Sequence, residues 1–223
     1  MTGRPQGAPE LVVFDLDGTL IDSIGDIASS ANQALAEAYG DPARLPQDMV
    51  RSFVGSGARH LMERCVAAAG QSRDDVPRVF DRFLEIYRSR LTETTRLYSG
   101  MDETLITLGA SARLAILTNK PGEMSRRIVK DLGLTSRFLA VIGGDDLKTK
   151  KPDPEGLLKI AADAGVSIKR VAMVGDSAVD MQTARHAGAL SVAVLWGYDV
   201  EGARLSEPDV VVASPGELAS ALA

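Results

Sequence analysis

The feature that most limits the folds open to this chain is a series of six short apolar segments. They are three or four residues long and lack the apolar–polar alternation of a half-exposed strand. We therefore expect each to be a strand that is buried on both faces. The segments are Leu11–Phe14, Leu114–Leu117, Ala140–Ile142, Val171–Val174, Val192–Leu195 and Val210–Val212.

Stretches with helical spacing of apolar residues lie between the later segments, and each is followed by glycine, a common left-handed helix end. They are Gly122–Leu132, Pro154–Ala164 and Ala178–Ala187. This alternation of strand and helix predicts an α/β fold with a doubly wound, Rossmann-like parallel sheet.

One interval is too long for this alternation. The first strand ends near Asp15 and the next ends at Thr118, so 118 − 15 = 103 positions separate them. A strand–helix–strand unit needs only about 30 residues. The surplus carries three apolar stripes with helical spacing and no convincing strand pattern. We predict a core domain formed by residues 1–22 and 97–223, with an inserted helical cap domain at residues 23–96.

The composition argues against several classes of partner. With 25 Lys and Arg against 30 Asp and Glu, the formal net charge is −5, without the basic footprint of a nucleic-acid-binding protein. No apolar stretch approaches the roughly 20 residues of a membrane span, and residues 1–10 do not resemble a secretory signal. The single cysteine, Cys65, cannot form an internal disulfide. We expect a cytoplasmic protein that binds neither nucleic acid nor membrane, with no prediction for its oligomeric state.

Polar residues follow four of the predicted strands. Ligands of α/β proteins bind beyond the carboxyl ends of parallel strands, so we expect these residues to form one site. They are Asp15, Asp17 and Gly18 after the first strand, Thr118, Asn119 and Lys120 after the second, Lys151 after the third, and Asp176 and Asp180 after the fourth. The side chain of Lys120 could face this site or water.

The order and spacing of these motifs resemble the haloacid dehalogenase superfamily, in particular its phosphatase branch with a helical cap inserted after the first strand. The motif Asp15-Leu16-Asp17-Gly18-Thr19 is the specific one, and the later motifs gain weight from their order. The cap stretch Val50–Ala58 and the tail Gly197-Tyr198 are similar to the bacterial phosphoglycolate phosphatases, a group within this family. The resemblance therefore implies hydrolysis of 2-phosphoglycolate to glycolate and phosphate.

Other activities stay open at this point. The alternatives are a sugar phosphomutase similar to β-phosphoglucomutase and a phosphatase for another small substrate, such as pyrophosphate, a nucleotide or a sugar phosphate. A dehalogenase would need no metal, so loss of activity in EDTA would argue against it. A non-catalytic binding module is less favoured, because the chain retains Asp15, Asp17, Lys151 and Asp176.

The resemblance also implies roles for the acidic residues. Asp15 would attack phosphorus and become an aspartyl phosphate, and Asp17 would act as general acid and then general base. Mg²⁺ would be held by the carboxylates of Asp15 and Asp176 and the backbone carbonyl of Asp17, with Asp180 orienting this shell. With Asp15, Asp176 and Asp180 ionised, Asp17 protonated and a doubly charged phosphate, the formal charge is −3 − 2 = −5. Mg²⁺ and Lys151 would reduce it to −5 + 3 = −2, so a divalent cation is expected.

The remaining candidates would bind the substrate. Thr118 and the Asn119 amide would donate to phosphoryl oxygens, and Lys151 would neutralise the charge that develops on them. Gly18 would let the backbone turn tightly beside the ligand. Arg59, in the predicted cap, would contact a substrate anion remote from the phosphate.

Overall fold

A six-stranded parallel sheet forms the centre of the protein, which we describe from a computed structural model over residues 7–222. The strand order is β5-β4-β1-β6-β7-β8, so β1 lies between two strands that come much later in the chain. The strands are β1 (Leu11–Phe14), β4 (Arg113–Leu117), β5 (Val141–Ile142), β6 (Val171–Gly175), β7 (Leu190–Val194) and β8 (Val210–Val212). The predicted doubly wound α/β sheet is thus confirmed.

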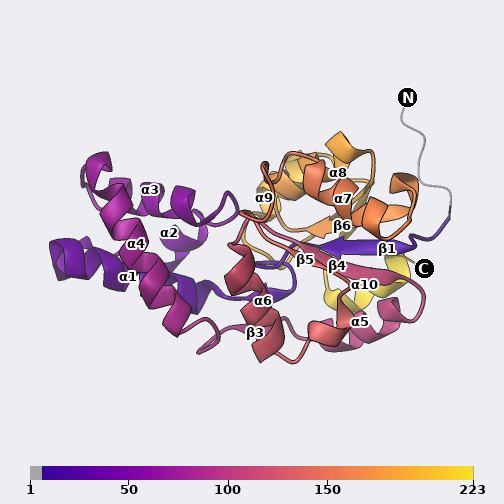
Figure 1. The fold of residues 1–223 in the computed structure, drawn as a ribbon, viewed down its shortest axis with the longest axis horizontal. Helices are drawn as coiled ribbons and strands as arrows, with labels where there is room; N and C mark the ends of the chain where they lie inside the picture. The colour runs from indigo at the N-terminus through magenta and orange to yellow at the C-terminus, as the bar shows by residue number, and fades with distance from the viewer. Residues whose placement is uncertain (1–6, 223) are drawn as a thin grey trace.

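Helices cover both faces of this sheet because successive side chains of each strand point to opposite faces. In β1, Val12 and Phe14 pack with the apolar residues of α5, α6 and α10, whereas Leu11 and Val13 pack with those of α7 and α8. Figure 1 shows α7 and α8 on one side of the sheet and α5 and α10 on the other. The helices are α5 (Met101–Gly109), α6 (Gly122–Asp131), α7 (Glu155–Asp163), α8 (Ala178–Ala187), α9 (Val200–Leu205) and α10 (Pro215–Ala221).

Four further helices form a separate group beyond the end of the sheet, towards which β1 points (Figure 1). We call this group the helical lobe; it consists of α1 (Ile24–Tyr39), α2 (Gln47–Arg51), α3 (Ala58–Ala68) and α4 (Val76–Ser89). Its helices present apolar faces to one another, with Leu35, Met62 and Phe83 almost fully buried. The lobe occupies the surplus interval in which the sequence pattern predicts helices and no strand.

The two chain segments that join the lobe to the sheet run side by side. The two-residue strands β2 (Ile21–Asp22) and β3 (Arg96–Leu97) pair antiparallel. Next to them, the buried carboxylate of Asp26 accepts hydrogen bonds from the backbone N–H groups and hydroxyls of Thr94 and Thr95 at 2.6–3.1 Å. The division into domains at residues 22/23 and 96/97 coincides with this ribbon and stays a prediction.

Some predicted boundaries differ from the observed ones. Strand β7 begins at Leu190, two residues before the prediction, because Leu190 pairs with Ala172 of β6. Strand β5 is reduced to Val141–Ile142, since only these residues pair with β4. Within residues 7–222, no helix is long and apolar enough to span a bilayer.

Candidate active site

The loop after β1 carries the first two candidate residues into the end of the sheet. The backbone N–H of Asp15 donates to the carbonyl of Val174 at 2.9 Å, which extends the pairing of β1 with β6 by one residue. Gly18 follows with a φ of +85°. A Cβ there would overlap the carboxylate of Asp176, so the turn needs glycine for both its conformation and its close approach.

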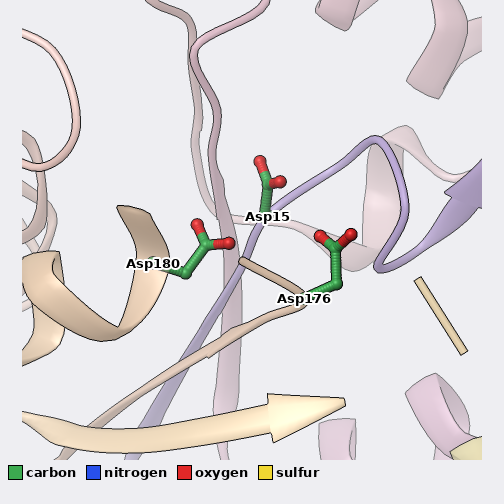
Figure 2. Close-up of side chains that lie close together, drawn as sticks. All are labelled: Asp15, Asp176 and Asp180. Carbon is green, nitrogen blue, oxygen red and sulfur yellow. The ribbon is translucent and has the colours of Figure 1, made fainter. Parts of the chain in front are cut away.

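Three carboxylates meet at this point. Asp15 follows β1, Asp176 follows β6 and Asp180 lies in the first turn of α8, and one oxygen of each lies within 4.8 Å of the others. Figure 2 shows the three side chains gathered at the strand ends. All three are buried, with Asp180 entirely inaccessible to solvent. Asp15 and Asp176, which are 161 positions apart, therefore lie together, as expected for residues at the carboxyl ends of neighbouring parallel strands.

Lys151 supplies positive charge to this cluster. Its ammonium nitrogen lies 2.8 Å from Asp15 Oδ1 and 2.6 Å from Asp180 Oδ1. Burial alone would lower the pKa of Lys151, but the carboxylates of Asp15 and Asp180 outweigh it and raise the pKa. Lys151 therefore stays cationic and holds Asp15 and Asp180 at fixed positions.

The negative charges of Asp15 and Asp176 are not fully balanced by nearby positive charge. Burial, opposed by Lys151, raises the pKa of Asp15 to about 6. Burial and the nearby charges of Asp180 and Asp15 raise the pKa of Asp176 to about 8. Burial of a carboxylate without a compensating cation raises its pKa in this way.

The position of Asp176 is fixed by residues to which the sequence analysis assigned no role. The hydroxyl of Thr19 donates to Asp176 Oδ1 at 3.0 Å, and the backbone N–H of Tyr198 donates to Oδ2 at 2.5 Å. The indole N–H of Trp196 donates to the carbonyl of Thr19 at 3.0 Å. Thr19 belongs to the first motif, so the sequence could have identified it as a site residue. The contacts of Trp196 and Tyr198 depend on tertiary structure and could not be predicted.

The donor set fits a magnesium ion. Magnesium prefers carboxylate and carbonyl oxygens, and Asp15 Oδ1 is buried without a well-aligned hydrogen bond among the described residues. Both oxygens of Asp180 are already engaged, one by Lys151 and the other by the hydroxyl of Ser177 at 2.6 Å. These contacts suit Asp180 to orienting the cluster. Both oxygens of Asp176 also accept hydrogen bonds, from Thr19 and Tyr198, so Asp15 and Asp176 stay the ligands that the resemblance implies.

Asp17 lies next to this cluster and is held by different partners. The ammonium of Lys120 contacts both of its carboxylate oxygens at 3.0 Å, and the hydroxyl of Ser23 donates to Oδ1 at 2.5 Å. The third donor of Lys120 goes to the phenol oxygen of Tyr87, on α4, at 2.6 Å. Lys120 thus faces the site and is 7% exposed, which resolves the choice between site and water.

A cavity of about 50 Å³ lies between this site and the helical lobe. Asp15, Asp17, Thr118, Asn119 and Lys120 line it on the side of the sheet. The walls are otherwise largely apolar and include Ile27, Val54, Leu61, Phe83 and Met124. Of the predicted substrate-binding residues of the sheet, Thr118 and Asn119 therefore border this cavity, whereas Gly18 and Lys151 do not line it.

Asn119 also contacts the helical lobe. Its side-chain NH₂ group donates to the carbonyls of Gly55 and Lys151, both at 3.0 Å. Because both amide hydrogens have acceptors, donation to a phosphoryl oxygen would fall to the backbone N–H of Asn119. Nearby, Lys150 donates to the carbonyl of Ser56 at 2.7 Å, so the lobe is closed onto the sheet.

Arg59 is not brought to this cavity. Its guanidinium lies 3.5 Å from Glu63 and over the ring of Phe80, and its side chain is 60% exposed. The neighbouring residue Ala58 and Leu61, one turn further along α3, line the cavity instead. The helical period therefore turns Arg59 to the outer face of α3, contrary to the expected substrate contact.

Known proteins are similar to this chain in sequence. Residues 12–194 match the haloacid dehalogenase-like hydrolase family. The chain is 38% identical over 226 residues to a phosphoglycolate phosphatase of Agrobacterium fabrum, covering 100% of this chain and 95% of that protein. It is 40% identical over 190 residues to one of Cereibacter sphaeroides, covering 84% and 85%.

A solved structure agrees. A crystal structure described as a predicted phosphoglycolate phosphatase from Haemophilus somnus superposes with a TM-score of 0.88 at 30% identity. The match covers 95% of this chain and 96% of that one. The buried acids, the lysine beside them and the inserted helical lobe therefore occur in a chain that belongs to the haloacid dehalogenase-like hydrolase family.

Proposed function

We propose that this protein is a magnesium-dependent phosphatase that hydrolyses 2-phosphoglycolate to glycolate and phosphate. The observation that carries the proposal is the cluster of Asp15, Asp176 and Asp180 around Lys151 at the strand ends. The family assignment supports it, as do the names of the relatives, which are phosphoglycolate phosphatases.

Asp15 is the proposed nucleophile. One of its carboxylate oxygens forms a bond to phosphorus while the bond from phosphorus to the ester oxygen breaks, giving an aspartyl phosphate. Asp17 gives a proton to the departing ester oxygen, and glycolate leaves. In the second step Asp17 accepts a proton from water as the water attacks phosphorus, which releases phosphate and restores Asp15.

Charge controls access to phosphorus in this scheme. Two unit charges about 4 Å apart repel by roughly 4 kcal/mol at an effective dielectric constant of about 20. The ammonium of Lys151 offsets part of this repulsion, with Thr118 and the backbone N–H of Asn119 as donors to the phosphoryl oxygens. Mg²⁺, held by Asp15, Asp176 and the backbone carbonyl of Asp17, would supply the remaining positive charge.

The volume of the cavity supports a small substrate. The cavity of about 50 Å³ leaves little room beside the phosphoryl site for a nucleoside or a sugar ring. Two carbons and a carboxylate make a short leaving group, as in 2-phosphoglycolate. A sugar phosphomutase, the alternative kept open by the sequence, would need a larger space or a different lobe position.

The test is phosphate release from a panel of phosphomonoesters, with Mg²⁺ and with excess EDTA. We expect 2-phosphoglycolate to have the highest kcat/KM and EDTA to abolish turnover. Asp15→Asn should lower the rate at least about a thousandfold. The exposed Asp163→Asn, at the end of α7, is the matched control and should retain activity. Near-normal release by Asp15→Asn, or equal rates on all esters, would contradict the proposal.

A further inference from the structure

One hydrogen bond in the cavity joins the sheet to the helical lobe. Lys120, from the loop after β4, and Tyr87, from α4, meet at 2.6 Å inside an otherwise largely apolar space. Among the described residues that line the cavity, Lys120 alone carries a positive charge. The Tyr87 side chain is buried, and the centroid of its ring lies 4.6 Å from the ammonium nitrogen of Lys120.

The hydrogen bonds of this pair are incomplete. An ammonium group has three donors, and Lys120 gives two to Asp17 and one to Tyr87. The Tyr87 hydroxyl accepts the last of these, and no acceptor for its own proton is found within residues 7–222. A buried donor without an acceptor costs about 1–3 kcal/mol, so this position favours an incoming anion.

The pair also lies at the right place along a bound ester. In the proposed chemistry Asp15 contacts phosphorus and Asp17 contacts the ester oxygen. Lys120 contacts Asp17, and Tyr87 lies beyond it on the side of the lobe. In 2-phosphoglycolate the carboxylate carbon is two bonds from the ester oxygen. A carboxylate at that position is therefore within reach of Lys120 and Tyr87 while phosphorus faces Asp15.

We propose that Lys120 and Tyr87 together form the recognition site for the carboxylate of the substrate. This inference rests on the proposed phosphatase function and extends it to the residues that select the leaving group. The carboxylate of the substrate accepts the N–H of Lys120 that now donates to Tyr87. It also accepts a hydrogen bond from the Tyr87 hydroxyl. Tyr87 is carried by the lobe, so recognition is complete only when the lobe is closed on the sheet.

The experiment compares 2-phosphoglycolate with ethyl phosphate, in which a methyl group replaces the carboxylate. The measured quantity is the ratio of the two kcat/KM values, because general damage to catalysis lowers both and leaves the ratio unchanged. Tyr87→Phe should reduce the ratio about tenfold, and Lys120→Met about a hundredfold. Inhibition by glycolate should weaken in parallel in both variants.

Lys150→Met is the matched control. Lys150 also bridges sheet and lobe, through the carbonyl of Ser56, but it does not line the cavity, so the ratio should stay at the wild-type value. If Lys120→Met is inactive on both esters, the ratio measured for Tyr87→Phe tests the proposal instead. Tyr87 contacts Lys120 and not Asp17, so its loss leaves the general acid in place.

The outcomes separate the two proposals. If the wild-type protein prefers 2-phosphoglycolate and both variants retain that preference, the recognition site is refuted and the phosphatase function stands. If the wild-type protein releases phosphate from both esters at equal rates, the substrate assignment fails and the recognition site fails with it. A fall in the ratio in Tyr87→Phe and Lys120→Met, but not in Lys150→Met, supports the inference.

Discussion

Replacing Asp26 by alanine should destabilise the protein strongly, although Asp26 lies outside the cavity. Asp26 is 1% exposed and its two carboxylate oxygens accept from four donors on Thr94 and Thr95. These contacts join the start of α1 to the segment that returns to the sheet. Asp26→Ala removes every acceptor at once and leaves the donors in place.

The size of the effect follows from which donors can reach water. Thr94 is exposed, so water can replace the carboxylate there. Thr95 is completely buried, and its N–H and hydroxyl would each lose an acceptor at about 1–3 kcal/mol. The two donors together give an expected loss of about 2–6 kcal/mol in the free energy of unfolding. For a chain of this length that corresponds to a fall in Tm of roughly 4–24 °C.

Urea unfolding followed by circular dichroism measures this loss directly. Glu93→Ala is the matched control, because Glu93 is an exposed acid in the same segment whose side chain forms no hydrogen bond or ion pair within residues 7–222. It should change stability by less than about 0.5 kcal/mol. Asp26→Asn should fall between the two, since its amide keeps one acceptor oxygen. A loss below about 1 kcal/mol in Asp26→Ala would refute the reasoning that the buried donors depend on this carboxylate.

Three further predictions concern the acid cluster. Because the pKa values of Asp15 (about 6) and Asp176 (about 8) exceed the ordinary 3.8, the folded metal-free protein binds more protons than the unfolded chain between about pH 4 and 8. Its Tm in EDTA should therefore fall as pH rises through that range, and Mg²⁺ should restore more stability at pH 8 than at pH 6; a Tm in EDTA that rises with pH would contradict this. Gly197→Ala should raise the Mg²⁺ concentration needed for half-maximal phosphate release about tenfold or more, because the added Cβ would overlap Asp176; unchanged magnesium dependence would count against this packing. Ser177→Ala should cost about 1 kcal/mol in urea unfolding, since the hydroxyl caps α8 by accepting from the N–H of Asp180, whereas Ser177→Thr should retain most of that stability.

Much of the sheet could be predicted from the sequence because its strands are buried on both faces. Continuous apolar segments such as Leu11–Phe14 and Val210–Val212 coincide with the observed strands to the residue. The strands β2 and β3 were missed, since two residues carry no periodicity and they exist only through pairing with each other. Helix α2, five residues long, is also too short for an apolar stripe to develop.

Some residues of the candidate site could also be predicted from the sequence, and others could not. The acids were found because motif order and strand ends are local properties of the sequence. Tyr87 was assigned only to the apolar stripe of its helix, which correctly indicated burial but said nothing of its hydroxyl. Arg59 was misplaced because a position near the start of a helix does not fix the direction of its side chain. The roles of the individual site residues stay predictions until the variants are measured.

The central position of β1 has a consequence for synthesis on the ribosome. This strand is made first, yet both of its hydrogen-bonding neighbours, β4 and β6, are made later, and β6 begins only at Val171. Until then, a nascent chain carries an apolar strand with at least one open edge, which can pair with another chain. The protein therefore depends on its last quarter to protect its first strand from aggregation, and chains released before Val171 should be targets for chaperones and proteases.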